Sequence, residues 1–383
     1  MRLGIVADEF FSQDVGRMGG FGWAARQVAR VFKQQPHLGV SVLFLAARLK
    51  SPNGSSHARI HDTPLLFYAC GQKYQGRILR QDLDLLLTID YRPSYRRILE
   101  NLSGTPVIVW VRDPKPAATQ TKIETLRMPD DGSIHPQGIK PINCRSLSLV
   151  LGPQVQPRRT VLFATPAPGL SALVEGAYGI PNADCDFLPN IVDMEVEEVR
   201  KSETPRVIFL GRLDPIKRPW LFVELARTFP KVEFLMLGQS HFHERGNWSI
   251  RELPANVKLL GHVDGEQKRQ ILSSAWVLAN TSIHESLPTS FLESLACETP
   301  LLSCTNLEGI VSQFGIFTGS WPGDGMSGLS AFANGLAQLI ENKERRTRFG
   351  QEGRRWVERT HNATTFLRAF DKLCMRAGVS GSR

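Results

Sequence analysis

The chain of 383 residues has few cysteines, and their spacing excludes two classes of protein. Its six cysteines include no Cys-x-x-Cys pair and no closely spaced set. A disulfide-stapled secreted domain and a cysteine-based zinc site both need such groupings. The sequence therefore indicates a reducing compartment and gives no support to a metal site.

Long apolar segments are also missing. No run approaches the ~20 consecutive apolar residues that a membrane helix needs, and the start, Met1-Arg-Leu-Gly-Ile-Val-Ala-Asp-Glu, reaches acidic residues too early for a signal peptide. We expect a soluble, cytoplasmic protein, with peripheral contact to the inner face of an anionic membrane left open. Paired zinc ligands and an aromatic RNP motif are absent, which argues against a nucleic-acid partner.

The formal net charge is +9, from 46 Lys and Arg against 37 Asp and Glu. A basic surface attracts polyanions with little selectivity, so nucleic acid, anionic lipid and anionic substrates are all compatible with it. Among these possible partners of the basic surface, nucleotide diphosphates are the simplest candidate. The basic groups at 345–348 and 354–355 are typical of solvated helix faces.

The length suits two domains of ~100–200 residues. Apolar runs alternate with amphipathic or polar segments, as in buried parallel strands covered by helices. The sequence therefore predicts doubly wound α/β structure in both halves. The expected strands are 3–7, 40–45, 83–89, 107–111, 147–151 and 160–164, then 207–210, 233–237, 257–260, 276–279, 301–303 and 315–318.

Two carboxylates, Glu285 and Glu293, flank a predicted loop-to-helix junction in the second half. Pro288 favours a helix start, and Ser290 with Glu293 has the spacing of a capping box. Unpaired N–H groups at a helix start can hold a phosphate, which would leave both carboxylates free to accept hydroxyls. Alternatively, Glu293 only caps the helix and Glu285 is solvated.

The stretch 282–296 resembles the Glu-x7-Glu motif of the retaining GT-B glycosyltransferases of family 4, the group 1 type. Segment 207–219 is similar to the strand and Gly-Arg…Lys signature of that family, and 187–193 to its domain-crossing segment. The resemblance implies two Rossmann-like domains facing across a cleft. The expected boundaries are an acceptor-side domain at 1–190, a linker at 191–204, a donor domain at 205–360 and a terminal helix at 361–383 that returns to the first domain.

The resemblance also implies roles for individual residues. Glu285 would contact the transferred sugar and Glu293 the ribose, while Arg212 and Lys217 would stabilise the leaving diphosphate without a metal ion. Without the motif match, Arg212 and Lys217 would be interpreted as surface charges near Asp214. Donor contacts are further implied for Gly19, Gly20, His262, Val263, Ser286, Leu287, Pro288 and Thr289, of which Pro288 has no N–H to donate.

The chain departs from the family pattern at Arg112-Asp113, where many members have His-Asp. Both residues follow a predicted strand and are acceptor-side candidates. Arg112 could bind an anionic acceptor or the donor, or it could form a structural ion pair with Asp113.

The function that the resemblance implies is hexosyl transfer from a nucleotide-diphosphate sugar, with UDP or GDP sugars as the expected co-substrates and no cofactor. The acceptor would be a glycan, a lipid-linked compound or a small molecule, as in polysaccharide biosynthesis, and the anomeric configuration would be retained. Two alternatives share the fold: a glycan phosphorylase or disaccharide synthase, and a catalytically silent nucleotide-sugar-binding protein.

Overall fold

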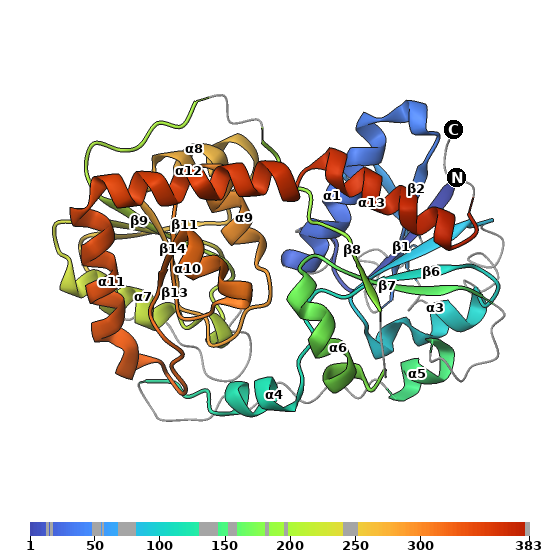
Figure 1. Cartoon of the computed structure of the whole chain (residues 1–383), viewed down its shortest axis with the longest axis horizontal. Helices are drawn as coiled ribbons and strands as arrows, with labels where there is room; N and C mark the ends of the chain where they lie inside the picture. The colour runs from blue at the N-terminus through green and yellow to red at the C-terminus, as the bar shows by residue number, and fades with distance from the viewer. Residues whose placement is uncertain are drawn as a thin grey trace. The chain divides into compact units, whose positions relative to one another are not determined.

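The structure, a computed structural model, describes residues 1–12, 15, 18–47, 55, 57–67, 82–129, 145–151, 159–180, 184–194, 198–239 and 252–379. The chain divides into two compact units (Figure 1). Unit 1 comprises Met1–Pro116, Pro141–Ile191 and Asn362–Arg383, and unit 2 comprises Ala117–Lys140 and Val192–His361. The expected first domain, 1–190, thus includes a segment, Ala117–Lys140, that groups with unit 2.

Unit 1 is built on an eight-stranded sheet in the order β3-β4-β2-β1-β5-β6-β7-β8. Neighbouring strands are parallel except for the antiparallel pair β3 and β4. The strands are β1 Arg2–Ala7, β2 Ser41–Ala46, β3 His57–Ile60, β4 Thr63–Phe67, β5 Leu85–Ile89, β6 Val107–Trp110, β7 Val161–Thr165 and β8 Cys185–Phe187.

The α-helices of unit 1 include the chain's last helix. They are α1 Gly20–Gln34, α3 Arg96–Asn101, α5 Arg145–Leu151, α6 Ser171–Tyr178 and α13 Ala363–Arg376. Helix α13 is amphipathic, and its apolar side is completely buried at Phe366 and nearly so at Phe370. The ring of Phe370 lies 5.3 Å from that of Phe32 on α1, and Phe366 lies 5.8 Å from Trp110 on β6. These contacts tie the C-terminal segment to the first α/β unit.

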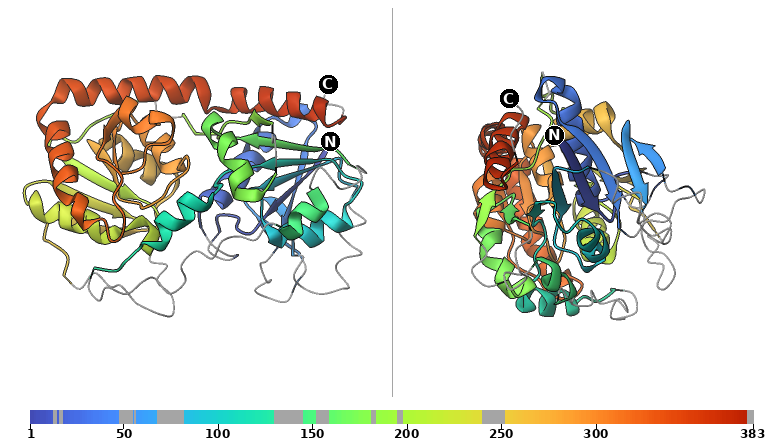
Figure 2. Two further views of the ribbon diagram at one scale, coloured as in Figure 1. Left: turned by 60° about the horizontal axis from the view of Figure 1, so that its bottom comes forward. Right: turned by 90° about the vertical axis from the view of Figure 1, so that its right-hand side faces the viewer.

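Unit 2 has a six-stranded sheet in the order β11-β10-β9-β12-β13-β14, and all its pairs are parallel. Helices cover both faces of this sheet (Figure 2). The strands are β9 Arg206–Leu210, β10 Glu233–Leu237, β11 Val257–Gly261, β12 Val277–Asn280, β13 Leu301–Ser303 and β14 Gly315–Phe317. The α-helices are α4 Ala117–Glu124, α7 Pro219–Thr228, α8 Gly265–Ser274, α9 Thr289–Ala296, α10 Ile310–Phe314, α11 Leu329–Glu341 and α12 Lys343–Thr360.

One face of the unit 2 sheet packs against α7 and α11 and against a segment from the first half of the chain. Ile123, Leu126 and Met128 are each at most 9% exposed and belong to the same apolar cluster as Phe222 of α7 and Phe332 of α11. The backbone N–H of Gly323 also donates to the hydroxyl of Thr125 at 3.0 Å. Burial of these apolar side chains explains why the segment groups with unit 2.

The structure confirms the predicted doubly wound α/β organisation, but the expected strand at 147–151 is wrong because these residues form the helix α5. Leu147, Val150 and Leu151 are buried, whereas Leu149 is 62% exposed. Positions i, i+3 and i+4 share one face of a helix, so this short apolar run has helical periodicity. Strands β3, β4 and β8 were not predicted.

No helix among the described residues is long and apolar enough to cross a bilayer.

Candidate functional site

The first group of candidate residues lies at the carboxyl edge of the unit 2 sheet. Strand β9 has β10 on one side and β12 on the other, so the chain winds away from β9 in both directions. Open α/β sheets bind ligands at such a switch point, beyond the carboxyl ends of the strands. Arg212 and Lys217 follow β9, and Glu285 follows β12.

Lys217 and Glu285 meet at this switch point. The Lys217 ammonium Nζ lies 2.6 Å from Glu285 Oε1, and the two side chains are 21% and 8% exposed. The hydroxyl of Ser282 and the amide of Asn280 donate to the same oxygen at 2.6 and 3.0 Å. All three donors bind Oε1, and within the described part of the chain no donor reaches Oε2. The carboxylate is therefore fixed by one oxygen, and the other remains available.

The surroundings of Glu285 keep its carboxyl group ionised. Burial by itself would raise the pKa of this group, but the Lys217 charge and the hydrogen bonds from Ser282 and Asn280 outweigh that effect. The pKa of Glu285 therefore lies below the ordinary range of a glutamate. A charged carboxylate at this position can accept hydroxyl hydrogen bonds and offset nearby positive charge.

Arg218, which the sequence reasoning did not single out, holds the two loops of this site together. Its guanidinium is completely buried and donates to the carbonyl of Thr281 at 2.7 Å, to the carbonyl of Trp321 at 2.7 Å and to the Cys304 thiol at 3.1 Å. Its backbone has φ +46°, a left-handed conformation that is strained for a residue with a side chain. A strained backbone persists only where the surrounding structure holds it, so the position of Arg218 is constrained by its contacts.

Direct hydrogen bonds also join the Lys217 loop to the Glu285 loop. The hydroxyl of Thr281 donates to the carbonyls of Lys217 and Arg218 at 2.7 and 3.0 Å. The N–H of Ile283 donates to the Ile216 carbonyl at 2.9 Å. These bonds restrict the positions from which Lys217 and Glu285 project.

Arg212 forms an ion pair with Asp214, with Arg212 Nε 3.3 Å from Asp214 Oδ2, and its side chain is 34% exposed. Asp214 also accepts the backbone N–H of Lys217 at 3.2 Å. The loop passes close to the end of β10, since a Cβ on Gly238 would lie only 1.8 Å from the Gly211 carbonyl oxygen. Glycine at 238 thus permits the contact between the two strand ends.

Glu293 lies on α9, but the predicted capping box is wrong. Helix α9 begins at Thr289 with Pro288 as its N-cap and has no side-chain cap. Ser290 is consequently inside the first turn, and Glu293 is too far along the helix to reach back to the cap. Helix α8, whose N-cap is Asp264, likewise has no side-chain cap hydrogen bond.

The carboxylate of Glu293 binds a buried lysine instead. Lys268 Nζ lies 2.7 Å from Glu293 Oε1 and 3.3 Å from Asp264 Oδ1, and Lys268 is 7% exposed. Burial would lower the pKa of this ammonium group, but the two carboxylates outweigh it, and the pKa lies above its usual range. Lys268 was not predicted, and its one sequence signal is the i, i+4 spacing from Asp264.

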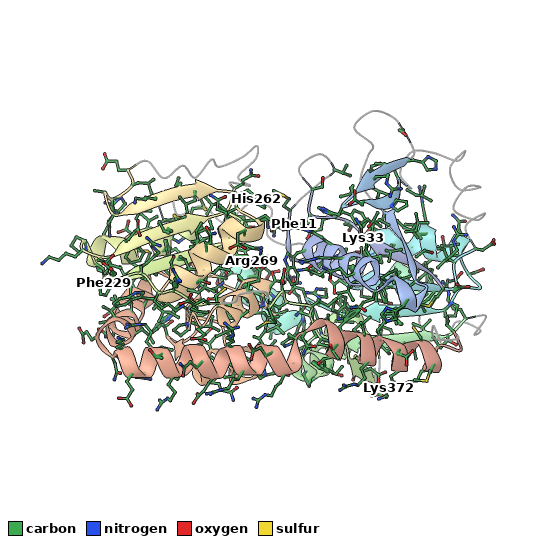
Figure 3. All side chains as sticks on the ribbon, turned by 90° about the horizontal axis from the view of Figure 1, so that it is seen from above. Phe11, Lys33, Phe229, His262, Arg269 and Lys372 are labelled. Atoms are coloured by element: carbon green, nitrogen blue, oxygen red, sulfur yellow. The ribbon has the colours of Figure 1, made fainter. Side chains whose placement is uncertain are left out.

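The other expected donor contacts of unit 2 follow β11 and precede α9. His262 comes directly after β11 and Val263 next to it is buried, with Arg269 on the following helix α8 (Figure 3). Ser286, Leu287, Pro288 and Thr289 form the approach to α9. Because this helix starts without a side-chain cap, its first N–H groups are suited to an anion.

In unit 1, the Gly19-Gly20 segment is the start of α1, and the first turn of that helix already has an acceptor. Glu9 Oε1 accepts the backbone N–H groups of Phe21 and Gly22 at 3.0 and 3.1 Å. A Cβ at Gly19 would lie 2.5 Å from the same oxygen, whereas one at Gly20 would meet nothing within 4 Å. A phosphate bound here would have to share these N–H groups with Glu9.

Asp90 organises the turn that carries Arg112 and Asp113. It follows β5, is 1% exposed and has φ +75°, which is strained for an aspartate. Its Oδ1 accepts the Tyr178 hydroxyl at 2.8 Å and the Arg112 backbone N–H at 3.3 Å. Its Oδ2 lies 3.4 Å from Arg92 Nε. Asp113 forms an ion pair with Lys115.

The ion pair between Arg112 and Asp113, one of the alternatives that the sequence left open, is not formed. The Arg112 guanidinium is stacked on the Trp110 ring, 4.4 Å from its centroid, and the residue is 5% exposed. Its buried Nη1 has no hydrogen-bond partner among the described residues, a situation that typically costs about 1–3 kcal/mol. Burial lowers the pKa of the guanidinium to about 10, although the carboxylates of Asp90 and Asp113 raise it, and the group stays charged at neutral pH.

The described residues contain no group of three or more His, Cys, Asp or Glu side chains placed to hold a metal ion.

A family model supports the interpretation of unit 2. Residues 193–356 match the model described as Glycosyl transferases group 1, and this range contains Arg212, Lys217, Glu285 and Glu293. The chain therefore carries a glycosyltransferase domain, which confirms that part of the expectation. No curated protein sequence matches the chain.

Solved structures support the fold over nearly the whole length. Sucrose-phosphate synthase from Thermosynechococcus elongatus superimposes with a TM-score of 0.73 at 13% identity, covering 98% of each chain. HepE of Anabaena in complex with UDP-glucose gives 0.68 at 13% identity, covering 98% of this chain and 100% of that one. WaaG, a glycosyltransferase involved in lipopolysaccharide biosynthesis, gives 0.67 at 11% identity, with 97% and 99% covered. The predicted GT-B fold is confirmed.

Proposed function

We propose that this protein transfers a sugar from a nucleotide-diphosphate sugar to an acceptor with retention of the anomeric configuration, and that it needs no metal ion. The observation that carries the proposal is the Lys217–Glu285 pair at the unit 2 switch point, inside the region that matches the glycosyltransferase model. A carboxylate fixed through one oxygen is suited to binding a sugar through the other.

Glu285 acts on the transferred sugar in this proposal. Positive charge develops on the sugar ring as its bond to the diphosphate breaks, and an ionised carboxylate stabilises that charge more in the transition state than in the ground state. The depressed pKa of Glu285 keeps the charge present at neutral pH. Oε2 accepts a sugar hydroxyl while Lys217, Ser282 and Asn280 hold Oε1.

Arg212, Lys217 and the start of α9 act on the leaving diphosphate. Negative charge accumulates on the phosphate oxygen as the bond breaks, and fixed cations and backbone N–H groups stabilise it. Lys217 carries three ammonium protons, of which one is used by Glu285. The uncapped first turn of α9, after Ser286, Leu287 and Pro288, supplies N–H groups from Thr289 onward. Two cations and a helix start make a metal ion dispensable.

Glu293 binds the ribose, and the segment at His262 and Val263 binds the base. Lys268 holds Glu293 through Oε1, so the second carboxylate oxygen is available for a ribose hydroxyl. UDP is the first nucleotide to test because HepE, which shares the fold, was solved with UDP-glucose.

Gly19 and Gly20 complete the donor contacts. Arg112 and Asp113 serve the acceptor, which is a glycan, a lipid-linked compound or a small molecule. We place the enzyme in the cytoplasm, at times at the membrane surface, which fractionation of cells would test.

The test is a thermal-stability screen with UDP, GDP and ADP and their sugars, followed by turnover assays. A nucleotide present at 100 times its Kd should stabilise the protein by about 2.7 kcal/mol. Product anomers identified by NMR test retention, and undiminished turnover in EDTA tests metal independence. If no nucleotide or nucleotide sugar raises the melting temperature or is consumed, the proposal is wrong. Strict dependence on inorganic phosphate would indicate a phosphorylase instead.

A further inference from the structure

Arg112 lies among charged residues at the carboxyl edge of the unit 1 sheet, and the buried Nη1 of its guanidinium has no hydrogen-bond partner among the described residues. Strand β1 has β2 on one side and β5 on the other, so this edge has its own switch point. Glu9 follows β1, Asp90 follows β5 and Arg112 follows β6. This is the position at which an open α/β sheet accepts a ligand.

Each carboxylate of this cluster already has its own donors. Glu9 accepts two N–H groups at the start of α1, where the helix dipole also favours a negative charge. Asp90 is paired with Arg92, and Asp113 with Lys115. These carboxylates are therefore satisfied without Arg112.

Arg112 has no such partner in the described part of the chain. Its guanidinium makes neither a hydrogen bond nor an ion pair there, although only 5% of the residue is exposed. The guanidinium carbon Cζ lies over the indole ring of Trp110, 4.4 Å from its centroid, and the buried Nη1 has no hydrogen-bond partner among the described residues. Buried polar groups without partners are rare in folded proteins, so this one requires an explanation.

We infer that Arg112 binds an anionic group of the acceptor, a phosphate or a carboxylate, so that the protein glycosylates negatively charged acceptors. This inference rests on the proposed function. The guanidinium edge presents parallel N–H donors that match two oxygens of an oxyanion, a geometry that a lysine cannot reproduce. An oxyanion at this position gains charge-assisted hydrogen bonds from the Arg112 guanidinium that a neutral group does not, which gives the site its preference for an anion.

The first experiment uses inorganic phosphate as the probe, with UDP present at saturation so that the donor's phosphate contacts are occupied. Phosphate should raise the melting temperature of the wild-type protein, and Arg112→Gln should abolish the increase. Arg346→Gln is the matched control because Arg346 is also a buried arginine over an indole ring, that of Trp276, but belongs to unit 2. The response to phosphate should persist in that variant even if its stability falls.

The second experiment compares a neutral acceptor with anionic acceptors that differ from it at one carbon: glucose with glucose 6-phosphate, and glucose with glucuronate. With the donor that the nucleotide screen identifies, we expect kcat/KM to favour the anionic member by roughly 10–100-fold, as for charge-assisted hydrogen bonds. Arg112→Gln should remove the preference, and Arg112→Lys, which keeps the charge but loses the fork, should retain part of it. Glucose 6-phosphate against glucuronate distinguishes phosphate from carboxylate as the group bound.

Equal kcat/KM for charged and neutral acceptors would overturn the inference, as would a charge preference that survives Arg112→Gln. If Arg112→Gln does not fold, an unreduced preference in the Arg112→Lys enzyme would overturn it as well. Failure of the proposed function is recognised separately, because the donor is then neither bound nor hydrolysed in the absence of any acceptor. Phosphate binding to the nucleotide-free protein can still be compared between wild type and Arg112→Gln in that case.

Discussion

The Lys217 ammonium lies 2.6 Å from Oε1 of Glu285, and these two residues come from loops that follow two neighbouring strands, β9 and β12. The pair links two regions of the chain that are 68 residues apart. It gives one carboxylate a counter-ion and one cation a fixed direction.

Replacing Glu285 by Gln should reduce turnover by ~100–1000-fold, as when one preorganised electrostatic group is removed elsewhere. The amide keeps the shape and loses the charge. Affinity for the bare nucleotide diphosphate, measured by calorimetry, should change little. Glu233→Gln is the matched control, because Glu233 is also ion-paired, with Arg206 and Lys258. It lies at the amino end of β10, whereas Glu285 lies beyond the carboxyl end of β12. Near-wild-type turnover of Glu285→Gln would place this residue away from the sugar.

Lys217→Met should lower the free energy of unfolding by about 1–3 kcal/mol, because the nearly buried Glu285 carboxylate loses its counter-ion but keeps the hydrogen bonds from Ser282 and Asn280. The double variant with Glu285→Gln should lose less than the sum of the two single losses. Urea unfolding of all four proteins measures this coupling. Additive losses would mean that the pair contributes no interaction energy.

The depressed pKa of Glu285 predicts a pH dependence with a definite sign. A carboxyl group with a lower pKa in the folded state stabilises the protein above the pKa of the unfolded chain, and this contribution is lost as the pH falls through the folded-state pKa. The stability advantage of wild type over Glu285→Gln should thus be constant at neutral pH and shrink in acid below pH ~4.3. An advantage that grows on acidification would contradict the assignment.

Glu293→Gln should weaken nucleotide binding about tenfold, equivalent to ~1.4 kcal/mol, and also lower the melting temperature, because Lys268 keeps only one of its two carboxylates. Asp264→Asn serves as the control, since it removes the other carboxylate and leaves Glu293 in place. Calorimetry with the nucleotide that binds best separates the two effects. If both variants lose the same affinity, Glu293 has no separate role at the ribose.

Arg218→Met should lower kcat at least tenfold with a smaller change in KM, because the loops that carry Lys217 and Glu285 lose their shared donor. Arg218→Lys should restore part of the rate. Arg346 is a suitable comparison: it is also a buried arginine that donates to carbonyls, those of Leu339 and Ile340, and stacks on Trp276. Arg346→Met should affect stability alone, so equal losses of kcat in both would make Arg218 merely structural.

The sequence predicted what depends on local patterns. Apolar runs located most of the strands, and the motif placed Lys217 and Glu285 directly after strand ends, which parallel sheets bring to one edge. It did not predict the Lys268–Glu293 pair, because that contact joins two helices across 25 residues. The capping-box expectation failed because α9 begins one residue after Pro288, which shifts Ser290 into the helix.

The burial of the Arg112 guanidinium and the packing of residues 117–128 against unit 2 also depend on tertiary contacts, so the sequence did not predict them. The sequence suggested an ion pair between Arg112 and its neighbour Asp113, but Asp113 pairs with Lys115 and the Arg112 side chain lies over Trp110. Ile123 and Leu126 are too few to establish a helical period, so their burial in unit 2 depends on tertiary packing.

That packing limits how the gene can be divided. A fragment beginning at Val192 would lack Ile123, Leu126 and Met128 and would leave apolar surface uncovered beside α7 and α11. A fragment ending at Ile191 would in turn lack Phe366 and Phe370. Each unit is compact by itself, but the two are interleaved along the chain, so recombination at a single crossover cannot exchange either one intact.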